Sequence, residues 1–150
     1  MRLLSPERAA ERIEHLVHFD TQRTSTGLDL TVGAVHRLTG AGQLDFGGGE
    51  YEAAAIEPMP PEKYRPDDAY GWWELRPGVY LVQYNEHVAP GEDEVAFVFP
   101  HERLLKAGAR HPAFRVDEAR RPLEAILVVG ERGLRLKENS RLSTLILLEV

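Results

Sequence analysis

Short apolar stretches recur along most of this chain, and turn-forming residues separate them. The clearest stretch is 28–32, where three apolar residues alternate with Asp29 and Thr31, as in a strand with one buried face. Further strand candidates lie at 51–56, 72–75, 79–84, 95–99, 114–117, 123–129, 133–136 and 142–150. Many short strands with turns between them predict an all-β fold, either an antiparallel sandwich, a jelly roll or a barrel.

Only the beginning of the chain shows a longer helical pattern. Ser5 is a suitable N-cap, and Pro6 suits the first helical position. The apolar residues that follow recur at helical spacing, namely Ala9, Ile13, Leu16 and Val17. We therefore predict one N-terminal helix within residues 1–20, ending near 18–20. Residues 103–108 could add one further helical turn closed by Gly108.

Two segments between the strands have distinct predicted roles. Residues 40–66 contain three consecutive glycines and a proline-rich run, which predict a long irregular loop insertion. Arg76-Pro77-Gly78 predicts a turn that joins 72–75 and 79–84 into a hairpin. That hairpin carries four large aromatic residues, Trp72, Trp73, Tyr80 and Tyr84. Because a thin sandwich buries so much aromatic surface poorly, the pattern indicates self-association.

Composition limits the possible chemistry. A chain of 150 residues that is 43% hydrophobic can form one domain over 1–150 with its own core. The absence of cysteine excludes thiol nucleophiles, disulfides and iron–sulfur ligation. A net charge of −6 disfavours nucleic-acid binding, although a local basic pocket could hold a small anion. No apolar run reaches the roughly 20 residues that span a membrane, so we expect a cytoplasmic protein.

The residues taken alone do not name a reaction. The six histidines form no ligand set with the spacing of a zinc site, and we predict no metal site in the chain. His15 and His18 are three residues apart and could hold a metal on a helix, but solvated or capping imidazoles are the commoner arrangement. The chain also shows no nucleophile elbow, P-loop or dinucleotide-binding loop.

Several segments occur in an order that resembles the dCTP deaminase and dUTPase superfamily, particularly its archaeal-type members. The first is Gln22 followed by the strand Gly27-Leu28-Asp29-Leu30-Thr31-Val32. The remaining similar segments are Leu75-Arg76-Pro77-Gly78-Val79-Tyr80, Asn85-Glu86-His87-Val88-Ala89-Pro90, the block from Pro100 to Gly108, Arg115-Val116-Asp117 and Ser140-Arg141-Leu142-Ser143-Thr144-Leu145. The resemblance covers nearly the whole chain.

The resemblance implies a distorted jelly roll, a homotrimer and active sites at subunit boundaries. It implies that a deoxynucleoside triphosphate binds there with Mg²⁺ on its phosphates. Asp117 would be the catalytic residue that orients water. The implied substrate-binding residues are Asp29, His101, Arg103, Arg115, Arg141 and Thr144.

The chain departs from the superfamily pattern at functional positions. Glu102 replaces a serine in the phosphate-binding block, and Ala119 and Pro122 replace glycines after Asp117. The catalytic glutamate of the deaminases would fall on Leu127, while Glu124 would point to the opposite face of its strand. These departures favour dUTP hydrolysis over deamination. They also leave open a non-catalytic trimeric binding or scaffold protein that retains the fold.

Two implied ligands have equally plausible structural roles. Asp29 lies in a strand flanked by turns, where its side chain could bond neighbouring backbone amides. Arg141 could pair with a surface carboxylate instead of a phosphate.

Overall fold

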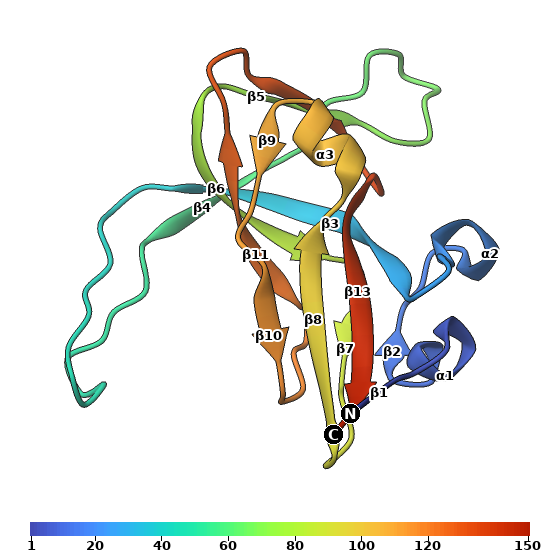
Figure 1. Ribbon diagram of the computed structural model, residues 1–150. Coiled ribbons are helices and arrows are strands. Elements are labelled where there is room, and N and C mark those ends of the chain that lie inside the picture. Colours follow the sequence, from blue (N-terminus) through green and yellow to red (C-terminus); the bar gives the residue numbers. More distant parts are fainter.

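A curled sheet of nine antiparallel strands dominates the computed structural model, which describes residues 1–150 (Figure 1). Its main path runs β10-β8-β13-β3-β6-β11-β9, with β1 added to β13 and β4 added to β3. The bounds of these strands are β1 Arg2–Leu3, β3 Leu28–Leu38, β4 Ile56–Met59, β6 Gly78–Tyr84, β8 Glu94–Pro100, β9 Ala109–Arg110, β10 Phe114–Val116, β11 Glu124–Val129 and β13 Arg141–Glu149. Strand makes up 45% of the chain and helix 9%, so the predicted all-β jelly-roll class is confirmed.

Two small sheets and three short helices complete the structure. One pair joins β5 (Trp72–Leu75) to β12 (Leu134–Lys137), and the other joins β2 (Ile13–Glu14) to β7 (His87–Val88). The helices are α1 (Pro6–Ala10), α2 (Phe19–Gln22) and α3 (Glu102–Lys106). None of the helices is long and apolar enough to cross a membrane.

Strand β3 curls the main sheet because its two halves pair with different neighbours. Its first half pairs with β13, and its second half pairs with β6 and β4. A register shift separates the two halves near Gly33, where a Cβ atom would lie 2.6 Å from Asn85 Oδ1. Leu28, Leu30 and Val32 lie fully inside the 27-residue apolar core. Asp29 and Thr31 between them are buried as well, so the prediction that only one face of this strand is buried is wrong.

The single N-terminal helix predicted for 1–20 is wrong. Helix α1 ends at Ala10, and Ile13 pairs as a strand residue with Val88. Arg12 donates two hydrogen bonds to Glu94, at 2.7 and 2.9 Å, which fixes the chain against β8 at this point. Helix α2 then begins at a new N-cap, where His18 Nδ1 accepts a hydrogen bond from the Thr21 amide. The capping role of His18 is therefore confirmed.

The predicted hairpin of 72–75 and 79–84 is also wrong. Strand β5 pairs with β12, whereas β6 pairs with β3 and β11. As a result Trp73, Tyr80 and Tyr84 all lie in the core of one chain, with at most 7% of their surface exposed. The aromatic surface predicted for self-association is not available, and only Trp72 of the four is partly exposed.

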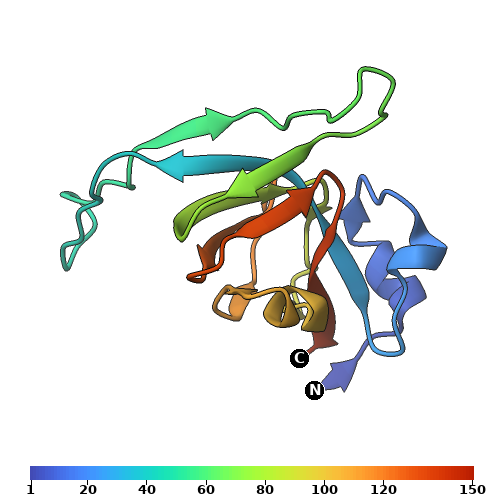
Figure 2. The ribbon, with the colours of Figure 1, turned by 90° about the horizontal axis from the view of Figure 1, so that it is seen from above.

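The segment between β3 and β5 is irregular over most of its length, as predicted. Its first part projects away from the sheet as a narrow arm (Figures 1 and 2). The strand predicted at 51–56 instead begins at Ile56, where β4 pairs with the second half of β3. Gly47, Gly48 and Gly49 lie at the exposed tip, with nothing near their Cβ positions, as expected for loop glycines. The other predicted strands, and the helical turn at 103–108, are confirmed within a few residues.

Candidate functional site

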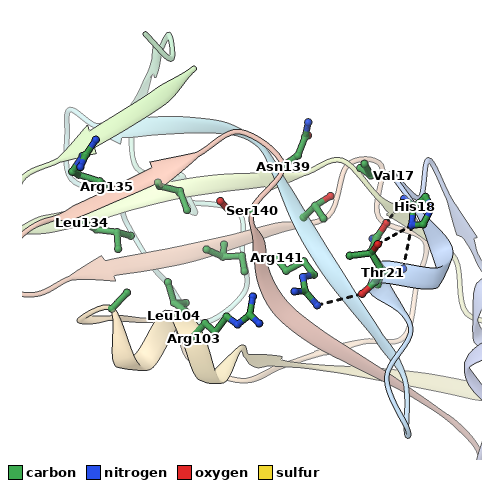
Figure 3. Close-up of a pocket in the computed structure, with 15 residues that line it drawn as sticks. Val17, His18, Thr21, Arg103, Leu104, Leu134, Arg135, Asn139, Ser140 and Arg141 are labelled. Carbon is green, nitrogen blue, oxygen red and sulfur yellow. Dashed lines mark hydrogen bonds between the residues drawn. The ribbon is translucent and has the colours of Figure 1, made fainter. Parts of the chain in front are cut away.

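A cleft of about 430 Å³ opens between helices α2 and α3 and the turn that joins β12 to β13 (Figure 3). Two arginines, Arg103 and Arg141, line it together with His18. None of its lining residues carries a carboxylate. The cleft is therefore a local cationic site in a protein whose net charge is −6, and it suits a small polyanion.

Arg141 begins β13 and is held from two sides. Its Nη1 lies 3.2 Å from Asp29 Oδ2 and also donates to the carbonyl oxygen of Thr21 at 3.2 Å. The side chain stays 29% exposed, so part of the guanidinium faces the solvent. The two contacts leave donors of the same group free for a ligand in the cleft.

Asp29 lies on β3 beneath this arginine and is almost fully buried, with 2% exposure. Thr144 lies directly opposite Asp29 on the neighbouring strand β13, and its hydroxyl donates a hydrogen bond to Asp29 Oδ1 at 2.8 Å. His101 Nε2 lies 3.2 Å from Oδ2. The carboxylate therefore bonds to side chains of β13 and of the α3 N-terminus, and the alternative in which it bonds backbone amides is wrong.

His101 connects the Asp29 cluster to Arg103. It caps α3, and its Nδ1 accepts a hydrogen bond from the Arg103 amide at 3.0 Å. Because Nδ1 is an acceptor, Nε2 carries the proton that faces Asp29. The neighbouring Glu102 does not line the cleft; it is exposed and pairs with Lys106 at 2.9 Å. The acidic departure in this block therefore does not oppose an anion in the cleft.

Arg135 lies at the margin of the cleft, but its guanidinium is on the face of β12 opposite Leu134 and Leu136, which line the cleft. It comes from β12, and its guanidinium lies 5.2 Å from the ring centres of both Tyr64 and Trp72. The two rings stack on each other, and Arg135 donates a hydrogen bond to the Tyr64 hydroxyl at 2.7 Å. The only signal of this placement in the sequence was the alternation of polar and apolar residues in 134–137, because the partner Tyr64 is remote in the chain.

Behind the cleft lies a buried carboxylate, Glu86, which sequence reasoning quoted but did not interpret. It has no exposed surface and accepts hydrogen bonds from the Thr31 amide and hydroxyl, both at 2.7 Å, and from Gln22 at 3.0 Å. Burial raises the pKa of Glu86 to about 7, and the Thr31 and Gln22 bonds partly oppose this shift. Since Gln22 and Thr31 both line the cleft, Glu86 fixes part of its wall.

A second buried polar group, Tyr84-Ser143-His111, does not reach the cleft. His111 Nδ1 lies 2.8 Å from the Pro112 carbonyl oxygen, and its Nε2 lies 2.7 Å from Ser143 Oγ, which also contacts the Tyr84 hydroxyl. Burial lowers the pKa of His111, which favours the neutral imidazole. With Nδ1 donating to the carbonyl, Nε2 accepts from serine. The group is internally satisfied and serves the core.

The predicted catalytic residue lies elsewhere. Asp117 follows β10 at the edge of the sheet and pairs with Arg115 at 2.6 Å. The two side chains are 46% and 63% exposed, and neither lines the cleft. One chain thus brings together Asp29, His101, Arg103, Arg141 and Thr144, but it does not bring Arg115 and Asp117 to them.

Comparisons with known proteins place this arrangement in a family. No family model matches the chain. A probable deoxyuridine 5'-triphosphate nucleotidohydrolase of Aeropyrum pernix is 33% identical over 126 residues, which cover 83% of this chain and 74% of that relative. One of Methanosarcina acetivorans is 31% identical over 136 residues, covering 89% and 76%. The chain belongs to the dCTP deaminase and dUTPase superfamily.

The solved structure of a 2'-deoxycytidine 5'-triphosphate deaminase from Agrobacterium tumefaciens shares the superfamily fold. It superposes with a TM-score of 0.68 over 99% of this chain and 48% of the deaminase chain. At 15% sequence identity, this likeness concerns the fold alone. The superfamily resemblance predicted from the order of the sequence segments is confirmed.

Proposed function

We propose that this protein binds a deoxynucleoside triphosphate in the arginine-lined cleft and hydrolyses dUTP to dUMP and pyrophosphate. The observation that carries the proposal is the meeting of Arg103 and Arg141 around one cleft whose lining carries no carboxylate. The dUTPase names of the relatives supply the substrate class. Such a substrate fits the cytoplasmic location expected from the sequence.

The arginines suit the triphosphate for a physical reason. A guanidinium presents several donors in a plane and binds phosphate oxygens through paired, charge-assisted hydrogen bonds. Asp29 and the Thr21 carbonyl fix Arg141 before any ligand arrives. Less side-chain entropy is then lost when phosphate binds.

The cleft residues fit Mg²⁺ carried by the substrate better than Mg²⁺ held by the protein. Mg²⁺ prefers carboxylate and water oxygens, and the cleft lining offers no carboxylate. Asp29, the acid paired with Arg141, is already engaged by His101, Arg141 and Thr144. Bound to the phosphates, the ion would offset their charge and polarise the phosphoryl oxygens.

Hydrolysis also needs a group that orients water, and we assign this role to Asp117 of a neighbouring copy. The water oxygen would form a bond to the α-phosphorus while the bond to the pyrophosphate oxygen breaks, with Asp117 accepting the water proton. The side chain of Asp117 is 46% exposed at a sheet edge, which leaves it accessible to another subunit. This assignment requires an oligomer, and a homotrimer with sites at its boundaries is the form that we propose.

Product analysis with purified protein tests the proposal. Incubation with dUTP and Mg²⁺ should give dUMP and pyrophosphate, whereas dCTP should not be deaminated. The D117N variant should lose at least about 100-fold in kcat while retaining its affinity for dUTP, because it keeps the arginines. Absence of turnover in the wild-type protein would exclude the catalytic assignment.

A binding protein without turnover is the second candidate. The observation that favours it is the distance of Asp117 from the arginine cluster along the sheet of one chain, so that a single copy has no carboxylate in the cleft. Thermal unfolding with and without dUTP distinguishes the candidates. A rise in Tm without product formation indicates retained binding. No rise with any of the four deoxynucleoside triphosphates or dUTP indicates a scaffold.

A further inference from the structure

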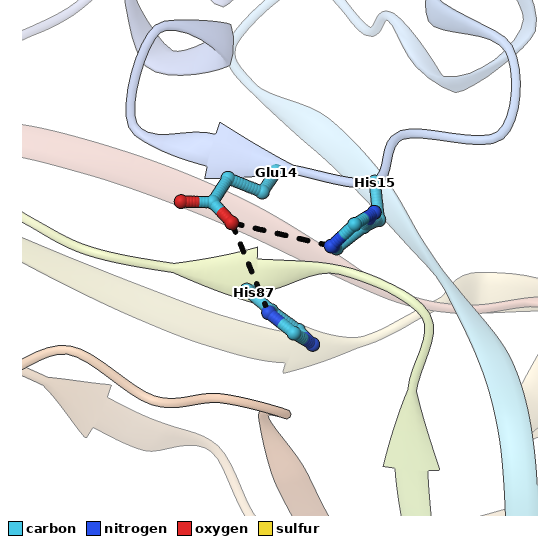
Figure 4. A group of neighbouring side chains, drawn as sticks. All are labelled: Glu14, His15 and His87. Atoms are coloured by element: carbon cyan, nitrogen blue, oxygen red, sulfur yellow. Dashed lines mark ion pairs between the residues drawn. The ribbon is translucent and has the colours of Figure 1, made fainter.

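Two histidines and a glutamate meet on the small β2-β7 sheet, away from the arginine-lined cleft. Glu14 and His87 are direct partners across this antiparallel pair, and His15 directly follows the end of β2 at Glu14 (Figure 4). One ligand atom from each of the three side chains lies within 4.8 Å of the others. None of the three residues lines the cleft. We propose that Glu14, His15 and His87 form a binding site for a divalent transition-metal ion such as Zn²⁺.

The spacing of the three ligand atoms suits a metal ion. Three atoms within 4.8 Å of one another have a common centre no more than about 2.8 Å from each, close to the roughly 2.0 to 2.2 Å bonds of zinc to nitrogen and oxygen. Glu14 Oε2 lies 4.0 Å from both His15 Nε2 and His87 Nδ1. Small rotations of these exposed side chains would complete the contacts, because 54% of Glu14 and 63% of His15 remain accessible.

The backbone and a neighbouring arginine hold this geometry. His15 has a φ of 67°, in the left-handed region that few residues other than glycine and asparagine adopt. In that conformation its ring lies 4.7 Å from the His87 ring, edge to face. Arg121 Nη1 lies 3.2 Å from Glu14 Oε1, so the other carboxylate oxygen is left to face the imidazoles. An outer partner that orients a ligating carboxylate in this way is a common feature of metal sites.

The donor set selects the class of metal. Two imidazoles and one carboxylate suit Zn²⁺ and its transition-metal neighbours, whereas Mg²⁺ and Ca²⁺ prefer oxygen ligands throughout. The site therefore differs from the Mg²⁺ expected on substrate phosphates. Three protein ligands leave at least one coordination position for water or another molecule. The ion would also join β2 to β7, which belong to distant parts of the chain.

Titration of the full-length protein with Zn²⁺ against a chromogenic chelator, without nucleotide, tests the proposal. We expect one high-affinity Zn²⁺ per chain that millimolar Mg²⁺ does not displace. H15N and H87Q should each weaken Zn²⁺ binding at least about tenfold. Asparagine tolerates the left-handed conformation, so H15N preserves the backbone. H18N is the matched control, since it removes a nearby imidazole and retains a helix cap.

The outcomes separate this proposal from the proposed function. Wild-type protein that takes up no Zn²⁺, or H15N and H87Q variants that bind as tightly as wild type, would overturn the site. An equal loss in H18N would also overturn it, because binding would then depend on histidine content alone. Circular dichroism of each variant verifies its folding. The D117N variant should bind Zn²⁺ normally, so loss of turnover and loss of this metal are independent results.

Discussion

Two arginine–aspartate pairs of the same chemistry lie in opposite surroundings. Arg141 and Asp29 meet at the wall of the cleft, where only 3% of the aspartate side chain is exposed. Arg115 and Asp117 meet at the edge strand β10, where 63% and 46% of their side chains are exposed. In the first pair His101 and Thr144 also bind the carboxylate, whereas in the second Asp117 has only the arginine.

The difference in burial shows how the same two residue types can serve different roles. A buried carboxylate with three side-chain partners is fixed, so Asp29 is suited to positioning Arg141 and not to meeting substrate. An exposed pair in water is weak and exchanges partners readily. The proposed role of Asp117 requires that it leave Arg115 for a substrate on a second copy, and the exposure of this pair makes that exchange inexpensive.

Substitution of Asp29 or Asp117 should give the largest difference in stability between the two pairs. D29A leaves Arg141, His101 and Thr144 without their partner, and we expect it to lower the free energy of unfolding by about 3 kcal/mol. D117A should change the same quantity by less than about 0.5 kcal/mol, since it removes an exposed pair. Urea denaturation followed by circular dichroism measures both. Equal effects of the two variants would contradict the difference in surroundings.

Glu86 extends the comparison to a buried acid that has no cationic partner. Its pKa is raised to about 7, so the folded protein holds a proton that the unfolded chain releases near its ordinary value of 4.5. The free energy of unfolding should therefore fall as pH rises from about 4.5 to 7, by at most about 3 kcal/mol from this group. E86Q should flatten this slope. Denaturation curves at several pH values measure it, and an unchanged slope in E86Q would contradict the assignment.

Substitution of an arginine inside or outside the cleft extends the comparison to the affinity for dUTP. R141Q should weaken dUTP binding by about 10- to 100-fold, because it removes from the cleft a charged group that donates hydrogen bonds to phosphate oxygens. R2Q is the matched control, because it removes an exposed arginine that pairs with Glu149 outside the cleft, and it should change the affinity less than about threefold. Calorimetric titration of the D117N background avoids turnover during the measurement. Unchanged affinity in R141Q would place the phosphates elsewhere.

The sequence predicted the strands well because period-two alternation reports burial directly, as in β11 and β12, where buried residues alternate with more exposed ones. It failed for 1–20, since the apolar residues Ile13, Leu16 and Val17 fit a helix equally well until the pairing of Ile13 with Val88 decides otherwise. The hairpin failed for a similar reason: a favourable turn at Pro77-Gly78 does not specify which strands pair. Local sequence patterns specify individual helices and strands, whereas the choice of which strands pair depends on the whole fold.

The candidate site was predictable in part. The order of segments indicated Asp29, His101, Arg103, Arg141 and Thr144, and the fold brings these residues to one place. The placement of the Arg135 guanidinium outside the cleft could not be predicted, because it depends on stacking with Tyr64 and Trp72 across long separations in sequence. The burial of Glu86 could not be predicted from the sequence either, since Thr31 and Gln22 contact it only in the folded chain.

Mixed oligomers test most directly whether Asp117 serves an arginine cleft on another copy. D117N and R141Q would be purified separately, unfolded together, refolded and assayed at dUTP concentrations below KM, with separately refolded variants as controls. If each site takes Asp117 from one copy and Arg141 from another, an equal mixture should recover up to roughly a quarter of wild-type turnover, because that share of sites then combines two intact partners. A mixture no more active than the average of its two variants would contradict the shared site.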